Sequence, residues 1–112
     1  MDKKYKVRSN REYRKIYDHG TSKANKLLVL FIKENGLGYN RVGFTVTKKV
    51  GKAVVRNRVR RLMKEAYRQH ELKNPTGYDL IFLSRVNCKD ATYKEVNSAV
   101  RHILKISFQE KK

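Results

Sequence analysis

Hydrophobic positions recur with two different periods along this chain, and the changes of period divide it into helices and strands. Near the N-terminus, Ser9 and Glu12 form a capping box, in which each side chain accepts a hydrogen bond from a free backbone amide of a helix start. The spacing predicts a helix from about Asn10 to His19, with Gly20 placed to end it. The residues that follow the box at helical spacing are Tyr13, Ile16 and Tyr17.

Two segments of strand length follow this helix. Residues 27–32 form a continuous apolar run, which a turn at residues 35–38 closes. Residues 41–47 alternate strictly, as a strand with one buried face does. We expect these two strands to pair as an antiparallel hairpin, and residues 21–26 to hold a short strand or a turn. The alternation puts Val42, Phe44 and Val46 on one face and Gly43, Thr45 and Thr47 on the other.

A helical period returns after these strands. From Val55 onward, apolar side chains fall within about 100° of arc on a helix, and basic side chains gather opposite them. Residues 74–77 then form a loop, residues 78–83 are interpreted as a buried strand, and a second capping box within residues 92–95 starts a last helix that reaches roughly to Phe108. The apolar residues of the two helices are Val55, Val59, Leu62, Met63 and Ala66, and Val96, Ala99, Val100, Ile103 and Leu104.

The order of these elements is helix, two or three strands, helix, strand, helix. Such an order, without repeats, linkers or low-complexity segments, predicts an α/β sandwich of mixed type. At 112 residues the chain is long enough for one modest core. We therefore expect a single domain over residues 1–112, with an ordered core from about residue 9 to residue 108.

Composition changes this picture chiefly through charge. The chain carries 28 Lys or Arg against 10 Asp or Glu, a formal net charge of +18. Residues 41–70 hold ten of the basic residues and one acid, so this central segment supplies +9, half of the net charge. Residues 27–40 hold only Lys33 and Glu34 as charged residues. A concentration of this kind indicates a binding site for a polyanion.

Nucleic acid fits this charge better than a membrane surface does. A basic helix on a membrane presents Trp, Phe or Leu opposite its charges and usually stands alone, whereas this basic segment lies between strand-like runs. No apolar run approaches the ~20 residues of a membrane span, and the N-terminus lacks the apolar part of a signal peptide. Cys88, the one cysteine, has no partner for an internal disulfide and is interpreted as a small apolar residue. We expect a cytoplasmic location.

Residues 48–65 carry the strongest chemical signal, because a basic loop leads directly into a basic helix face. Gly51 lets the backbone approach a ligand closely, and the positive end of the following helix favours phosphate. Arg60, Arg61 and Lys64 lie within single helical turns of one another, where like charges repel. A bound polyanion would relieve that repulsion. The alternative of a solvated face stays open for any one of these residues but explains the cluster poorly.

The same stretch resembles the signature of the bacterial ribonuclease P protein subunit, whose core is the Arg-Asn-Arg box standing here at residues 56–58. Residues from about 9 to 104 can be laid along that family, with the last helix matching only in pattern. The positions that carry the resemblance beyond the box are Lys48, Lys49, Gly51, Ala53, Val54 and Arg61, and upstream residues 13–17, 19–22, 24–25 and 41–43.

This resemblance implies a concrete function. The family's protein binds a large catalytic RNA, and together they remove the 5′ leader from precursor transfer RNA. The RNA carries the Mg²⁺-dependent chemistry, while the protein positions the leader and supports productive metal binding. Neither a catalytic residue nor a metal ligand is then expected on the protein, and neither a membrane nor a small molecule as its partner. The residues expected to bind the catalytic RNA are Lys48, Lys49, Lys52, Arg56, Asn57, Arg58, Arg60, Arg61, Lys64 and Arg68.

The resemblance also implies a fold and a second RNA site. The fold runs α-β-β-β-α-β-α, with a mixed four-stranded sheet, an uncommon left-handed crossover around the basic helix and a likeness to the second domain of ribosomal protein S5. The second site is a cleft for the leader, in which aromatic rings stack on unpaired bases without demanding a sequence. The residues expected to line it are Tyr13, Tyr17, Phe31, Lys33, Thr45, Thr47 and Lys49.

The residues themselves leave an alternative open for the aromatic positions. Tyr13 and Tyr17, four residues apart, are also what the core stripe of a helix looks like. If the neighbours of Phe31 at period two face the core, Phe31 faces the other way, but the continuous apolar run leaves the core side of that strand undecided. The family often has Phe at both helix positions. We expect the Tyr hydroxyls here to add hydrogen bonds to bases or ribose.

Two other classes of protein compete with this interpretation. A protein-only nuclease needs clustered carboxylates to hold Mg²⁺ or to act as acid and base. The ten acids here are scattered, and none forms a motif with His19, His70 or His102. A ribosomal protein would explain the charge, but not the aromatic residues at matched spacing.

Overall fold

Three α-helices and four strands follow one another in the order α1, β1, β2, β3, α2, β4, α3 within residues 3–109, the part of the chain that the computed structural model describes. This order is the predicted one, and of the strand or turn expected within residues 21–26 the strand is present. The helices are α1 (Asn10–His19), α2 (Ala53–His70) and α3 (Tyr93–Gln109), and the strands are β1 (Thr21–Ala24), β2 (Leu28–Glu34), β3 (Arg41–Thr45) and β4 (Tyr78–Ser84).

Local sequence signals explain both ends of α1. The predicted capping box is present: Ser9 Oγ accepts from the Glu12 amide at 3.2 Å, and Glu12 Oε1 accepts from the Ser9 amide at 3.1 Å. Gly20 ends the helix as predicted, but with an ordinary φ of −85°. A Cβ at Gly20 would lie 2.5 Å from the carbonyl oxygen of Ile32. Glycine is therefore needed here because the chain passes close over β2, and not for a left-handed conformation.

The predicted hairpin between residues 27–32 and residues 41–47 is wrong. The sheet order is β1-β2-β4-β3, so β4 lies between the two segments. β2 is antiparallel to β1 and β4, and β3 is parallel to β4 at the sheet edge. The physical reason is that β4 is buried on both faces, since Leu80, Ile81 and Phe82 are all inaccessible to solvent. A strand of this kind needs a neighbour on each side.

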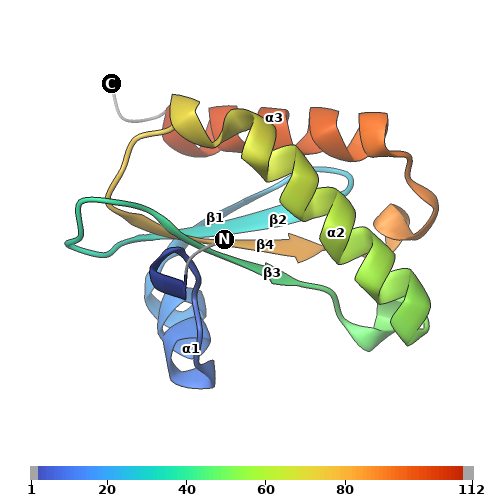
Figure 1. The fold of residues 1–112 in the computed structure, drawn as a ribbon, viewed down its shortest axis with the longest axis horizontal. Helices are drawn as coiled ribbons and strands as arrows, with labels where there is room; N and C mark the ends of the chain where they lie inside the picture. The colour runs from blue at the N-terminus through green and yellow to red at the C-terminus, as the bar shows by residue number, and fades with distance from the viewer. Residues whose placement is uncertain (1–2, 110–112) are drawn as a thin grey trace.

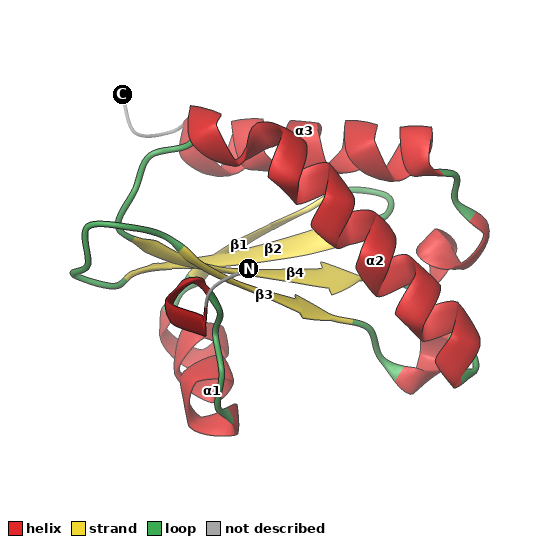
Figure 2. Cartoon of the chain, in the orientation of Figure 1, coloured by secondary structure: helices red, strands yellow, loops and turns green. Residues whose placement is uncertain are grey.

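The helices cover the two faces of the sheet unequally, as Figures 1 and 2 show: α2 and α3 lie together on one face, and α1 lies alone on the other. The main core lies between the sheet and the helix pair. A much smaller cluster of Val7, Ile16 and Ile81 lies under α1. The residues that build the main core include Leu28, Leu30, Ile32, Val42, Leu80 and Phe82 from the strands, and Val59, Met63, Ala66, Val96, Val100 and Ile103 from the helices.

The connection from β3 through α2 to β4 gives the sheet its parallel pair. In Figure 1 both strands run toward the right, α2 lies above the sheet, and β4 lies behind β3, so the crossover is left-handed. General chirality rules favour the right-handed form, and the left-handed form is the one that the family resemblance implied. β3 ends at Thr45, two residues before the predicted end, because a 3-10 helix (Lys48–Val50) begins the turn toward α2.

Cys88 is buried in the main core with a free thiol, which agrees with its interpretation as a small apolar residue. Burial raises the pKa of this thiol above its ordinary value, so it is held protonated. Within residues 3–109, no helix combines the length and the apolar character that crossing a bilayer requires.

Candidate nucleic-acid interface

Three aromatic rings meet where α1 crosses the sheet. Tyr17 and Phe31 contact edge to face, with ring centroids 4.8 Å apart. Tyr13 lies one turn earlier on α1, and its centroid is 6.3 Å from that of Tyr17. Phe31 reaches this face because Leu30 and Ile32, its neighbours on β2, point into the main core. The side of β2 that the sequence left undecided is thus settled, and Phe31 lies on the α1 side.

Exposure separates the three helix positions that the sequence placed on one stripe. Ile16 is 1% exposed and is the core residue of α1, whereas Tyr17 is 36% exposed at the edge of the helix. Tyr13 and Phe31 are half-buried and pack against the small cluster under α1. The alternative that these residues form the core stripe of the helix is therefore correct for Ile16 and correct in part for Tyr13. It is not correct for Tyr17, whose ring stays accessible. We call Tyr13, Tyr17 and Phe31 the aromatic cluster.

The tyrosine hydroxyls of the aromatic cluster connect α1 to β3. The Tyr17 hydroxyl lies 3.2 Å from Thr45 Oγ1, within hydrogen-bond distance. The Tyr13 hydroxyl reaches the backbone of Phe44, and its ring occupies the space that a side chain at Gly43 would take. Burial is the main cause that raises the pKa of Tyr13. The expected hydrogen bonds of these hydroxyls to bases or ribose stay a prediction.

The strand register defines the floor beside the aromatic cluster. Phe31 stands level with Ser22 on β1 and Ile81 on β4. The next row on the same face joins Val29, Leu83 and Thr45, and all three are half-buried. Period two along β2 puts Val29 on the face of Phe31, but neither Val29 nor Leu83 was among the predicted site residues. Leu83 could be placed there only once β4 was known to be the central strand.

The remaining predicted cleft residues lie on β2 and in the turn that follows β3. Lys33 is half-buried on β2, and its ammonium donates to the Glu34 carbonyl at 3.3 Å. Thr47 lies beyond the end of β3 and precedes the 3-10 helix, so it does not continue the strand face as predicted. Lys49 is exposed within that 3-10 helix.

The predicted basic face of α2 is present and hollowed. Asn57, Arg60, Arg61 and Lys64 line a shallow pocket of about 320 Å³. Arg60 Nη1 donates to Asn57 Oδ1 at 2.9 Å, which fixes the direction of that guanidinium along the helix. Arg68, one turn beyond, lies 3.9 Å from Glu65 in an exposed pair. Such a pair is too weak to remove Arg68 from the basic face.

The two arginines of the Arg-Asn-Arg box hold the loops at the start of α2. Arg56 Nε donates to the Gly51 carbonyl at 3.2 Å, and Arg58 Nη2 donates to the Ala91 carbonyl at 3.1 Å. Gly51 has a φ of +155°, which disfavours any other residue at this point. Each guanidinium has five N–H donors, so both keep free groups for a phosphate. Sequence analysis missed this second, structural task of the two side chains.

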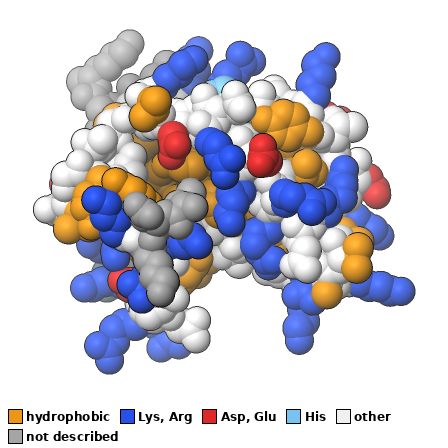
Figure 3. All heavy atoms as spheres, in the orientation of Figure 1, with side chains coloured by type: hydrophobic (Ala, Val, Ile, Leu, Met, Phe, Trp, Pro, Cys, Tyr) orange, Lys and Arg blue, Asp and Glu red, His pale blue; other side chains and the backbone are white. Residues whose placement is uncertain are grey.

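The start of α2 is open to an anion. Lys52 occupies the N-cap, and no side chain caps the free amides of this 18-residue helix. Free amides and the helix dipole together favour a negative ligand there. Lys48, Lys49 and Lys52 are exposed around the same point. In Figure 3 blue Lys and Arg side chains gather at the lower right, over this end of α2 and the loop before it.

The charge of Arg60 on α2 acts on the aromatic cluster. It opposes the rise in the pKa of the Tyr13 hydroxyl, which burial and the neighbouring Tyr17 cause.

The described part of the chain offers no evident place for a metal ion. Among residues 3–109, no group of three or more His, Cys, Asp or Glu side chains is close enough together to hold one. His70 Nε2 lies 2.9 Å from Asn97 Oδ1, and His102 Nδ1 lies 3.2 Å from Asn25 Nδ2. Both rings thus take part in ordinary hydrogen bonds.

The left-handed α+β sandwich, its basic helix and its half-covered sheet face define a class of small basic domain suited to bind a polyanion such as nucleic acid. The family model described as Ribonuclease P matches residues 1–107, and the chain belongs to that family. It is 51% identical to the ribonuclease P protein component of Alkaliphilus metalliredigens over 105 residues, which cover 94% of this chain and 95% of that protein. The family forms the protein part of an endoribonuclease that processes transfer RNA and has an RNA partner.

Solved structures of ribonuclease P proteins share this fold. A Staphylococcus aureus ribonuclease P protein mutant described as defective in mRNA degradation activity superposes with a TM-score of 0.87 at 32% identity, covering 94% of this chain and 89% of that chain. The Thermotoga maritima ribonuclease P protein gives a TM-score of 0.83 at 28% identity, covering 90% of this chain and 96% of that one.

Proposed function

We propose that this protein binds the catalytic RNA of ribonuclease P through α2 and the 5′ leader of precursor transfer RNA through the aromatic cluster. Together they would promote Mg²⁺-dependent cleavage that gives the mature 5′ end. The observation that carries this proposal is that one small fold presents both an accessible Tyr17 ring in contact with Phe31 and a basic pocket on α2, and that the charge of Arg60 in that pocket acts on Tyr13. A ribosomal protein would need the basic face alone.

The division of labour follows from the chemistry of the side chains. Rings that stack on bases and cations that contact phosphates bind and orient RNA, and neither performs phosphodiester cleavage. The described residues contain no carboxylate cluster for two-metal chemistry. Mg²⁺ would supply that chemistry on the RNA, and the protein would hold the leader in register with the cleavage site.

A reconstitution tests this function directly. The protein is mixed with a bacterial ribonuclease P RNA at low Mg²⁺, and cleavage of precursor transfer RNA is compared with RNA alone and protein alone. Faster cleavage only in the mixture is the expected result. Absence of stimulation would contradict the proposal and favour a ribosomal role. Cleavage by protein alone would instead indicate a nuclease, a relevant outcome given the mRNA degradation activity named for the S. aureus protein.

A further inference from the structure

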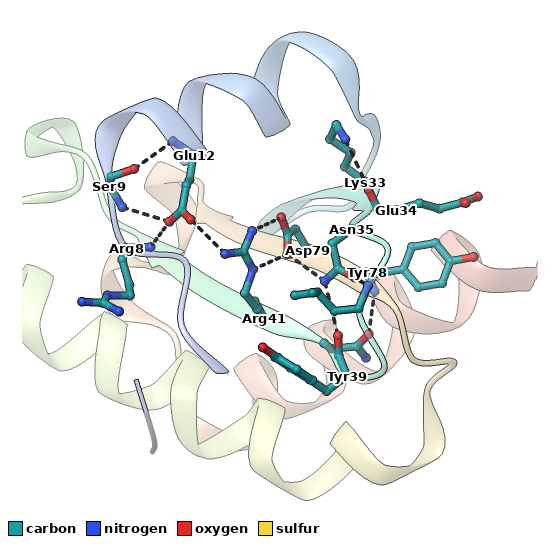
Figure 4. A network of polar contacts seen from close by, with 12 residues as sticks. Arg8, Ser9, Glu12, Lys33, Glu34, Asn35, Tyr39, Arg41, Tyr78 and Asp79 are labelled. Atoms are coloured by element: carbon teal, nitrogen blue, oxygen red, sulfur yellow. Dashed lines mark hydrogen bonds and ion pairs between the residues drawn. The ribbon is translucent and has the colours of Figure 1, made fainter. Parts of the chain in front are cut away.

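Arg41 connects three elements of the fold through one guanidinium, as Figure 4 shows. Its Nε and Nη2 donate to the two carboxylate oxygens of Asp79 on β4, at 2.8 and 2.7 Å. Its Nη1 donates to Glu12 Oε2 on α1 at 2.8 Å. One side chain of β3 therefore holds the neighbouring strand and the helix on the α1 side of the sheet.

Asp79, the carboxylate that pairs with Arg41, is buried and held by several hydrogen bonds. Asp79 is 5% exposed, although it is charged. Its Oδ1 also accepts from Asn35 Nδ2 at 2.9 Å, so both oxygens are occupied. A bidentate guanidinium–carboxylate pair fixes direction as well as distance, unlike a pair made by Lys. The hydrogen bonds to Asp79 are the main cause that raises the pKa of Arg41.

Glu12 links Arg41 to the N-terminal end of α1 through hydrogen bonds. Its Oε1 accepts from the amides of Arg8 and Ser9 at 2.8 and 3.1 Å, while its Oε2 accepts from Arg41. The same carboxylate thus caps α1 and fixes the capped end to β3. Tyr13 follows Glu12 directly in the chain, and Tyr17 lies one turn further along the helix.

The rings of the aromatic cluster also hold α1 to the sheet, beside the small core of Val7, Ile16 and Ile81. Tyr13 and Phe31 pack on that core, and the Tyr17 hydroxyl lies within hydrogen-bond distance of Thr45. A base that stacks on these rings would change their contacts with one another. The Arg41–Glu12 pair is independent of the rings and would keep α1 in place while RNA enters.

We propose that Arg41 is a positioning residue for the leader cleft, holding α1 through Glu12 so that Tyr13 and Tyr17 face the sheet at a spacing that accepts a base. This inference rests on the proposed function, because it assumes that the aromatic cluster binds the leader. Arg41 itself needs no contact with RNA.

Three variants separate position from charge. Arg41→Lys keeps the positive charge but cannot make the bidentate pair and reach Glu12 together. Glu12→Gln keeps the capping-box hydrogen bonds and removes the negative charge that faces Arg41. Asp79→Asn keeps the shape of the side chain. The last two variants make the protein more positive, so general attraction to RNA would rise. A fall in leader affinity would then not be explained by the change in charge, because that change favours RNA binding.

The experiment measures the affinity of each reconstituted holoenzyme for precursor and for mature transfer RNA, well below the unfolding temperature of the variant. The leader-dependent gain is the ratio of the two dissociation constants. We expect this ratio to fall by about tenfold in Arg41→Lys and by about threefold in Glu12→Gln, comparable to losing all or part of one stacked base. Affinity for the catalytic RNA should stay within about twofold of the wild type, since α2 is unchanged.

Arg101→Gln on the opposite face of the sheet is the matched control, because it removes an exposed positive charge without touching α1. It should leave the leader-dependent gain unchanged. If folded Arg41→Lys and Glu12→Gln keep the full gain, the cluster only stabilises the fold and the inference is overturned. If the wild type shows no leader-dependent gain, the leader-binding part of the proposed function fails first, and the inference falls with it.

Discussion

Two glycines show how single residues shape the cleft. A Cβ at Gly20 would meet backbone, 2.5 Å from the Ile32 carbonyl oxygen and 2.7 Å from that of Ile16. A Cβ at Gly43 would meet a side chain, 2.3 Å from the Tyr13 hydroxyl oxygen. Backbone within a sheet cannot move aside, whereas the end of a tyrosine can. The same change at the two positions should therefore have different consequences.

Gly20→Ala should mainly destabilise the protein, and Gly43→Ala should mainly weaken leader binding. We expect Gly20→Ala to lower the free energy of unfolding by about 2–3 kcal/mol, the upper part of the range for overpacking. Gly43→Ala should cost about 1 kcal/mol, since Tyr13 can move, but it displaces that ring from its place beside Tyr17. Urea denaturation measures the first effect, and the precursor-to-mature affinity ratio measures the second.

Tyr13→Phe in the Gly43→Ala background supplies the control, because it removes the closest atom in the clash. The double variant should recover part of the lost stability. Equal destabilisation with and without the hydroxyl would show that Tyr13 is not the residue that Gly43 accommodates.

Glu12 should make the free energy of unfolding depend on pH in the acid range. Its pKa lies below its ordinary value of 4.5, chiefly because the Arg8 amide donates to the carboxylate, with further help from Ser9 and Arg41. A carboxyl group with a lowered folded pKa stabilises the protein fully above its unfolded pKa, and this contribution is lost as pH falls through the folded value. The stability difference between the wild type and Glu12→Gln should therefore shrink as pH falls from about 6 to about 3. Urea denaturation across that range measures it, and a difference that stays constant would contradict the assignment.

At the scale of the element, local signals were sufficient for the helices and insufficient for strand pairing. The Ser9–Glu12 capping box and the helical period of α2 depend on residues within a few positions of each other, so the sequence predicts them correctly. The predicted hairpin was wrong because β2 and β3 could pair with each other only if β4 did not lie between them. Whether β4 takes that central place depends on burial across the whole sheet, which no local signal records. The Arg41 cluster was missed for a related reason: its partners lie 29 and 38 residues away.

The basic residues of α2 should separate into structural and RNA-binding residues. Arg58 donates to the Ala91 carbonyl, whereas Arg61 is exposed one turn later. Arg61→Ala should weaken binding to the catalytic RNA and reduce the salt dependence by about one phosphate, without changing the unfolding temperature. Arg58→Ala should lower the unfolding temperature as well, because it releases the loop at Ala91. Salt-dependent binding and thermal unfolding distinguish the two. An unchanged salt slope for Arg61→Ala would remove that residue from the RNA-binding face.

At the scale of the whole molecule, the uneven distribution of a net charge of +18 gives the protein two different surfaces. α2 presents cations with few acids, on the side of the sheet that holds the main core. The half-covered opposite side presents the rings of Tyr13 and Tyr17 from α1, the ring of Phe31 from β2 and the hydroxyl of Thr45 from β3. A large folded RNA offers dense phosphate, and a single strand offers bases that can stack. In the proposed function, the layered fold would place both kinds of recognition on one small domain, with their common border at the β3 edge.

This border predicts which pairs of substitutions act independently. Phe31→Ala should weaken binding of precursor but not of mature transfer RNA, and Arg61→Ala should weaken binding of the catalytic RNA. Their effects should add in the double variant, because the two residues lie on separate surfaces. Tyr13→Ala and Arg60→Ala should not add, since the charge of Arg60 acts on the Tyr13 hydroxyl and one RNA segment would contact both. Dissociation constants for the four single and two double variants test this. Equal additivity in both pairs would mean that no single RNA segment contacts both Tyr13 and Arg60.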